Sequence, residues 1–199
     1  SAYYIKYYVG KPEQTAAFLT VYGVALAAGS LITPLLTRFI DKRRLLIILM
    51  VLVGILSSAF FFIPKDQIGL MYGLQLAIGL CLGPKSPLTF SMYADCADYN
   101  EYKTGRRATA MTFAAATFSQ KLGGALASVV IASVLASLGY VANQGQGGAS
   151  KDGIVMLMSL VPGGIALVAS GLMLLYNLSD TRMKDIQAEL ESRKAAKTE

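Results

Sequence analysis

The chain has 199 residues, of which 54% are hydrophobic and only 15% are charged, against about 25% charged residues in soluble domains. Five long stretches contain only two of the charges, Lys85 and Lys121. A soluble fold needs charge on the outer face of its helices, and these stretches lack it. A soluble class is therefore excluded, and we predict an integral membrane protein.

Four further classes are disfavoured by the sequence. The sequence has no histidine, so a zinc or iron site of the usual kinds is not expected, and Cys81 and Cys96 are too few for a disulfide framework. The net charge of +6 does not indicate nucleic-acid binding, because the basic residues fall in short loops between apolar stretches. No stretch contains a nucleophile with a base or a metal set, so an enzyme is not expected.

Each of the five stretches is long enough to cross a membrane, because about 20 helical residues span a hydrocarbon core of about 30 Å. In chain order they are residues 14–37, 45–64, 67–94, 108–138 and 153–179. The third contains two pairs of small residues spaced by four, Gly69 with Gly73 and Gly79 with Gly83. Such pairs predict close packing of this helix inside a bundle.

Basic residues in the loops predict the orientation. Residues 38–44, 95–107 and 180–199 contain 12 Lys and Arg, and the alternate loops contain 4. The positive-inside rule places the first group, with the C-terminus, in the cytoplasm. The tail, residues 180–199, is predicted to be a solvated amphipathic helix with Ile186 and Leu190 on one face.

This orientation places residues 1–13 outside the membrane without a signal segment to carry them. We therefore expect residues 1–10 to be the end of a truncated transmembrane helix, residues 11–179 to form a five-helix bundle, and the sequence to be the C-terminal part of a longer protein. An engineered or processed start is the alternative.

Lys121 and Lys85 are the candidate functional residues inside the membrane. Lys121 lies about 21 Å beyond Arg107 along its helix, too deep for its side chain to reach the surface. A buried ammonium faces a bundle interior or a water-filled cavity and pairs with an anion, yet no Asp or Glu lies within the five stretches. Its partner is expected to be water, a substrate or carboxylates from a missing part of the chain. A wet structural crevice is the alternative.

Lys85 lies at a similar depth between Pro84 and Pro87. Proline interrupts the hydrogen-bond ladder of a helix, so these residues predict a broken helix that lines a cavity. The alternative for Lys85 is a residue of a kinked vestibule that faces the cytoplasm, with no functional role.

A charged segment follows the third stretch. Asp95, Asp98 and Glu101 recur every three residues, so they share one helix face, and the cations Lys103, Arg106 and Arg107 follow. Internal ion pairs in a solvated loop would give the same pattern. The run from Tyr93 to Arg107 also resembles the "AD, DY, E, KTG, R" signature of the glycoside-pentoside-hexuronide:cation symporters of the major facilitator superfamily. The resemblance extends upstream through Gly83-Pro84 and Pro87-Leu88, and downstream through Gln120-Lys121-Leu122-Gly123 to Gly139-Tyr140.

The resemblance implies an all-α membrane protein of twelve helices in two halves, with a sugar bound between the halves. The five stretches would be helices eight to twelve, and residues 1–10 the end of helix seven. It implies sugar or glycoside symport with Na⁺ or H⁺ by alternating access in the inner membrane, with the missing N-terminal half as partner and no organic cofactor. The competing hypothesis is a self-contained five-span structural or assembly protein without transport activity.

The resemblance also implies residue roles. Lys121 falls at a helix-eleven lysine near the cation site, where a fixed ammonium would compete with the cation for the carboxylates and couple its binding to conformation. The implied substrate-binding residues are Phe90, Lys85, Thr117, Gln120 and Lys121. Residues 38–44 resemble a short basic loop motif of the superfamily without its usual glycine; the alternative is orientation by charge alone. With the charged segment they would form a cytoplasmic gate from Asp41, Arg43, Arg44, Asp95, Asp98, Glu101, Lys103, Arg106 and Arg107. Phe90 and Tyr102 stand where relatives often have tryptophan, so the sugar is not identified.

Overall fold

The computed structural model describes residues 3–140 and 147–195, and these residues form helices and connecting turns without a strand. Five segments are long and apolar enough to cross a membrane, namely residues 12–36, 42–62, 68–104, 109–137 and 150–173. The predicted all-α class with five membrane-spanning segments is therefore confirmed. Parts of two other predicted segments, residues 1–2 of the truncated helix end at 1–10 and residues 196–199 of the tail at 180–199, lie outside the described residues.

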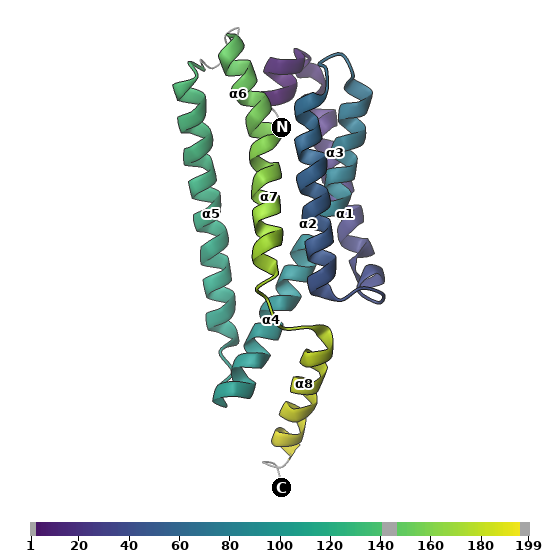
Figure 1. Ribbon diagram of the computed structural model, residues 1–199, viewed down its shortest axis with the longest axis vertical. Coiled ribbons are helices and arrows are strands. Elements are labelled where there is room, and N and C mark those ends of the chain that lie inside the picture. The colour runs from purple at the N-terminus through teal and green to yellow at the C-terminus, as the bar shows by residue number, and fades with distance from the viewer. Residues whose placement is uncertain (1–2, 141–146, 196–199) are drawn as a thin grey trace.

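The first elements in chain order are a π-helix (Tyr4–Val9), a 3₁₀ turn (Pro12–Gln14), α1 (Thr15–Leu36), α2 (Lys42–Ala59) and a second 3₁₀ turn (Phe60–Phe62). They are followed by α3 (Ile68–Leu82), α4 (Lys85–Thr104), α5 (Thr109–Ser137), α6 (Gly148–Met158), α7 (Leu160–Met173) and α8 (Asp180–Ala195), as labelled in Figure 1. The π-helix is followed by Gly10, whose φ of 75° lies in the left-handed region that glycine favours.

Two of the five membrane segments consist of two helices each. The interruption predicted at Pro84 is present, because α3 ends at Leu82 and α4 begins at Lys85. The interruption of the fifth segment at Ser159 was not predicted. Pro162 explains it, because proline has no N–H to donate to the carbonyl of Met158 and its ring crowds that carbonyl. The fifth helix also ends at residue 173 rather than at the predicted residue 179.

Four helices pack side by side as the core of the bundle. α1 packs against α3, α3 against α2, and α2 against α7, as Figure 1 shows. The contact between α1 and α3 depends on glycine. A Cβ atom at Gly29 would lie 2.3 Å from the carbonyl oxygen of Leu80, and one at Gly83 would lie 2.4 Å from that of Leu26. The backbones therefore approach more closely than any larger residue permits.

Only one of the two predicted small-residue pairs has this role. A Cβ atom at Gly79 would lie 2.6 Å from the Cβ of Ala25, so Gly79 and Gly83 both face α1. At Gly69 and Gly73 no atom of the described residues lies within 4 Å of an added Cβ. The prediction of close packing was therefore correct for the second pair and wrong for the first.

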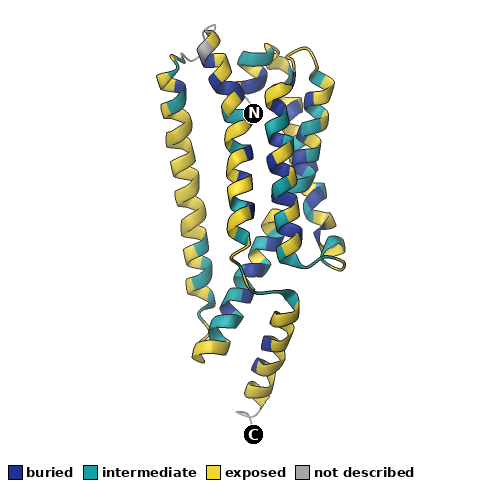
Figure 2. Cartoon of the chain, in the orientation of Figure 1, coloured by how far each residue is buried: buried dark blue, intermediate teal, exposed yellow. Residues whose placement is uncertain are grey.

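Helix α5 is separated from this core. Among the described elements it packs mainly against α4 and α6. Every residue from 117 to 133 is exposed, and Figure 2 shows the middle of α5 as a continuous exposed surface. Gly123 and Gly124, on this exposed stretch, have open space around them.

Helix α8 confirms the amphipathic pattern of the tail but is not solvated on all sides. Met183, Ile186 and Leu190 are only 3%, 5% and 6% exposed. They pack with Tyr99 and Leu178, and α8 lies against α4. The prediction of a solvated tail therefore holds for the outer face only, because the apolar face is covered by α4.

Candidate functional site

Three of the predicted substrate-binding residues lie together on the exposed middle of α5. Thr117, Gln120 and Lys121 are all exposed, and the hydroxyl of Thr117 donates to the carbonyl of Phe113 at 2.8 Å. Lys121 makes no ion pair or side-chain hydrogen bond with any residue that the structure describes. An ammonium at membrane depth needs a polar or anionic partner, and the described part of this chain supplies none.

Phe90 belongs to an aromatic cluster that joins α4 to α5. Its ring stacks on that of Phe113, with centroids 6.2 Å apart and an interplanar angle of 19°. Tyr93 meets both rings edge-on, with each centroid distance 5.9 Å. Phe90 is still 49% exposed, so one aromatic surface remains open to a ligand such as a sugar ring.

Phe113 was not identified from the sequence, although a signal for it exists. Phe113, Thr117 and Lys121 are spaced by four, so they follow one face of a helix. An aromatic residue, a hydroxyl and an ammonium on one face would have marked Phe113 as part of the same surface.

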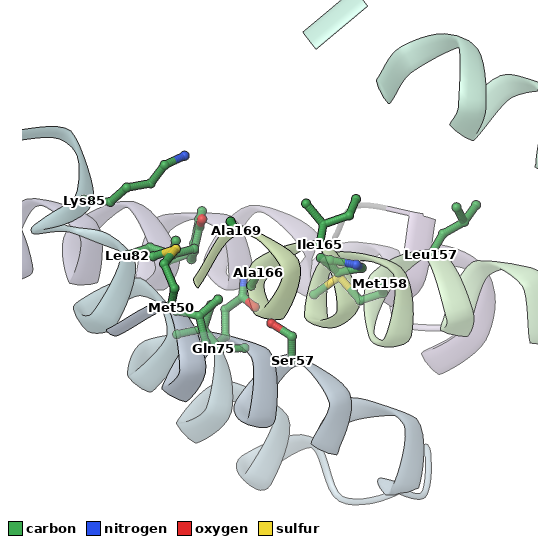
Figure 3. Close-up of a pocket in the computed structure, with 14 residues that line it drawn as sticks. Met50, Ser57, Gln75, Leu82, Lys85, Leu157, Met158, Ile165, Ala166 and Ala169 are labelled. Carbon is green, nitrogen blue, oxygen red and sulfur yellow. The ribbon is translucent and has the colours of Figure 1, made fainter. Parts of the chain in front are cut away.

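Lys85 does not line the same surface but is one of the residues that line a cavity of about 450 Å³, whose other lining residues come from α1, α2, α3, α6 and α7. The cavity is mostly apolar, but Gln75 from α3 and Ser57 from α2 point into it (Figure 3). Gln75 is only 2% exposed and Ser57 4%. The side chain of Lys85 extends away from them at one edge of the cavity, so the structure does not bring Lys85 and these polar groups together (Figure 3).

The predicted cytoplasmic cluster assembles along the acidic face of α4. The carboxylate of Asp95, which is 5% exposed, accepts a hydrogen bond from the ammonium of Lys42. The same ammonium donates to the hydroxyl of Ser91 at 3.3 Å and lies 3.4 Å from a carboxylate oxygen of Asp180. Lys42 was not among the predicted gate residues, although it lies within the basic loop assigned to the gate.

Asp98 and Glu101 form the internal ion pairs that the sequence allowed. The guanidinium of Arg107 lies 2.8 Å from Asp98 and 3.8 Å from Glu101. Helix α8 adds two contacts, because Gln187 donates to Asp98 at 3.3 Å and the ammonium of Lys194 lies 3.4 Å from Glu101. The α4 carboxylates are thus paired both with their own segment and with the tail.

The two other predicted cations of this segment have lesser contacts. The ammonium of Lys103 lies over the ring of Tyr99, 5.3 Å from its centroid. At Arg106 it is the backbone that is engaged, because its carbonyl accepts a hydrogen bond from the amide of Asn100 at 2.9 Å.

Asp41 and Arg43 act on helix ends. Asp41 caps α2, because its carboxylate accepts the backbone N–H of Arg43 at 3.0 Å. The guanidinium of Arg43 donates to the carbonyls of Met173 at 3.3 Å and Leu174 at 2.6 Å. These carbonyls stand at the C-terminal end of α7, where that of Met173 also accepts the backbone N–H of Tyr176 at 3.2 Å, so Arg43 caps α7 from outside.

The expected charge pairs between the basic loop and α4 therefore involve a different residue. Within residues 3–140 and 147–195, the only ion pair that links residues 38–44 to α4 is the one between Lys42 and Asp95. Arg43 and Arg44 instead line a cavity with Leu174 of the connection from α7 to α8. Sequence spacing shows that adjacent helical residues project at different angles, but it does not show which of them points toward α4.

Comparison with known proteins identifies the family. Residues 1–180 match the family described as MFS/sugar transport protein, where MFS denotes the major facilitator superfamily. The chain belongs to this family. The resemblance to the glycoside-pentoside-hexuronide:cation symporters is also confirmed by the relatives, which include named symporters.

Three relatives illustrate the similarity. The chain is 31% identical over 191 residues to the inner membrane symporter YicJ of Escherichia coli (strain K12), an alignment covering 94% of this chain and 41% of that protein. It is 29% identical over 200 residues to the putative glycoside/cation symporter YagG of the same organism, covering 99% and 43%. It is 34% identical over 185 residues to an uncharacterized 29.9 kDa protein in the crtE 3' region of Pseudescherichia vulneris, covering 92% and 68%.

The chain thus spans less than half the length of the two symporters. Their names describe transporters rather than enzymes, which agrees with the expectation that this chain is not an enzyme. YicJ is named as an inner membrane protein, and the five apolar segments of this chain are compatible with that location.

Proposed function

We propose that this chain forms the C-terminal half of a secondary active transporter that moves a sugar or glycoside together with Na⁺ or H⁺ by alternating access. The family match and the glycoside/cation symporter among the relatives support this function. The observation that carries it is the position of Lys121, a membrane-embedded ammonium in the middle of an exposed helix face. Such a face requires a polar partner.

In this proposal the partner is a group of carboxylates on an N-terminal half. The ammonium of Lys121 pairs with them when no cation is bound. A bound Na⁺ or H⁺ neutralises the same carboxylates, so cation and ammonium compete for one site. Because each state favours a different arrangement of the two halves, occupancy of the cation site is coupled to conformation.

The sugar lies between the halves in this proposal, next to the aromatic cluster. The exposed ring of Phe90 offers a surface for the apolar face of a sugar ring. Thr117 and Gln120 lie on the same exposed stretch of α5 as Lys121 and supply hydrogen-bonding groups to sugar hydroxyls. In this proposal the α4 carboxylates Asp95, Asp98 and Glu101, with Lys42 as the partner of Asp95, belong to the gate and lie closer to the C-terminal end of α4 than Phe90 does.

The experiment replaces Lys121 in the whole transporter. We expect Lys121→Ala to abolish accumulation driven by a cation gradient in proteoliposomes, because the carboxylates lose their competitor. Lys65→Ala is the matched control, since Lys65 is an exposed lysine outside the membrane segments, and it is expected to retain accumulation. Unchanged coupling in folded Lys121→Ala protein would remove Lys121 from the mechanism.

A further inference from the structure

A second cavity lies where α2, α7 and α8 meet, and the proposed transport mechanism does not use it. Its volume is about 540 Å³. The residues that line it come from the start of α2, the connection after α7 and the start of α8, namely Asp41, Arg43, Arg44, Ile47, Leu174, Ser179 and Thr181. It therefore lies at the ends of two membrane-spanning segments.

The lining combines two kinds of chemistry. Arg43, Arg44, Ser179 and Thr181 form a polar part, with guanidinium and hydroxyl groups as their hydrogen-bond donors. Ile47 and Leu174 form an apolar part. Leu174 is 59% exposed and the next residue, Leu175, is 75% exposed, so this edge of the cavity continues into a surface suited to lipid acyl chains. A site with this division matches the part of a phospholipid where the phosphate joins the acyl chains.

Arg44 supplies a positive charge to the cavity that is not paired within the described residues. Its side chain is exposed, and it makes no hydrogen bond or ion pair with the part of the chain that the structure describes. Arg43 uses Nε and Nη2 to cap α7, which leaves part of its five-donor guanidinium group free.

One carboxylate also lines the cavity, and it does not cancel this charge. Asp41 accepts the backbone N–H groups of Arg43 at 3.0 Å and of Asp180 at 2.8 Å. The cavity therefore has two guanidinium groups against one carboxylate that is already hydrogen-bonded.

We propose that this cavity binds the phosphate group of an anionic phospholipid from the adjoining membrane leaflet. Arg44 donates to the phosphate oxygens through its planar guanidinium, which matches the geometry of phosphate, and Thr181 donates from its hydroxyl. The glycerol and upper acyl chains lie against Ile47 and Leu174. A soluble phosphate would use the same polar groups but would leave the apolar part without a partner.

The test measures lipid binding to the full protein in detergent by native mass spectrometry. Phosphatidylglycerol is titrated against phosphatidylcholine, which has the same phosphodiester without net charge. We expect Arg44→Gln to weaken phosphatidylglycerol binding at least about tenfold, the effect of losing one hydrogen bond between two charged groups. Arg38→Gln is the matched control, because Arg38 is an exposed arginine of the same loop that does not line the cavity and loses no contact with the phosphate, so a change below about twofold is expected there.

Three results would overturn the proposal. Equal losses in Arg44→Gln and Arg38→Gln would show diffuse attraction to the whole basic loop. Equal binding of the two lipids would show that the anionic charge is not recognised. Displacement of phosphatidylglycerol by millimolar glycerol 3-phosphate would assign the site to a soluble phosphate.

Thr181→Val provides a second variant if Arg44→Gln does not fold. It removes one hydrogen bond without removing charge, and we expect phosphatidylglycerol binding to weaken about fivefold. Unchanged binding in this variant would also contradict the proposed lipid site.

Discussion

At the scale of single residues, Lys42 joins three helices. Its ammonium pairs with Asp95 of α4, and its backbone N–H, at the start of α2, donates to Asp180 of α8 at 3.1 Å. The Lys42 side chain is 20% exposed and that of Asp95 is 7% exposed, so water screens this pair only in part.

Replacement of Asp95 by asparagine tests the importance of this pair. We expect Asp95→Asn to lower the free energy of unfolding by about 2 kcal/mol, below the 3–5 kcal/mol of a fully buried pair, because Asp180 remains near the ammonium. The measurement is denaturant unfolding in detergent micelles. Glu189→Gln is the control, since Glu189 pairs with Arg193 on the exposed face of α8 and its loss is expected to cost less than about 0.5 kcal/mol. Equal effects of both changes would contradict the assigned role of Lys42.

The glycines provide a second prediction at this scale. We expect Gly29→Ala to lower the free energy of unfolding by about 1–3 kcal/mol, because its Cβ would overlap the Leu80 carbonyl and force α1 and α3 apart. We expect Gly73→Ala to be neutral or stabilising by up to about 1 kcal/mol, because Gly73 has open space and alanine favours a helix. Thermal unfolding of both variants distinguishes a close helix contact from a general effect of helical glycine. A loss at Gly73 would support the packing that the sequence predicted there.

At the scale of elements, α8 is held to α4 by both apolar and polar contacts. Its buried residues Met183, Ile186 and Leu190 lie against Tyr99 and Leu178. The polar contacts from Gln187 and Lys194 lie beside this seam and reach the α4 carboxylates. The tail therefore stabilises the arrangement of the α4 carboxylates Asp98 and Glu101.

A change in the apolar seam tests this attachment. We expect Ile186→Ala to increase amide hydrogen exchange across α8 at least tenfold, because removing a buried isoleucine side chain costs about 2–5 kcal/mol of packing. Glu191→Ala on the exposed face is the control and is expected to leave exchange unchanged. If α8 exchanged rapidly in the unchanged protein, the helix would not be docked on α4 in solution.

The sequence predicted these elements where a local signal determines them. Long apolar stretches identified five membrane segments, and Pro84 identified the break between α3 and α4. Pro162 is the corresponding signal for the break at Ser159, but residues 153–179 were predicted as one continuous span because they are uniformly hydrophobic. The neighbour that each helix surface contacts was harder to predict from the sequence. Spacing shows that Gly73 and Gly79 both suit a helix contact, but the neighbour that reaches Gly79 is set by tertiary packing.

The candidate site shows the same division. The charges at Lys121 and along α4 were evident from the sequence, because charge at such positions is costly and rare. The sequence did not show that Lys42 rather than Arg43 is the partner of Asp95. This depends on the direction in which each side chain projects from the start of α2.

At the scale of the whole molecule, the chain forms a packed core with one helix beside it. The helices α1, α3, α2 and α7 bury their contacts against one another, whereas α5 leaves its middle exposed (Figure 2). The exposed stretch contains Lys121, Gln120 and Thr117, which are polar residues at membrane depth. The proposed function explains this distribution, because it places α5 opposite a second half of the transporter.

The decisive measurement is the steady-state accumulation of labelled glycosides in proteoliposomes that contain the whole transporter. Inward gradients of Na⁺ and of H⁺ are imposed separately and compared with no gradient. Cation-coupled symport predicts that one gradient raises a glycoside inside above its outside concentration, and that without a gradient the two concentrations only become equal. Transport that reaches the same level with and without both gradients would contradict the proposed coupling.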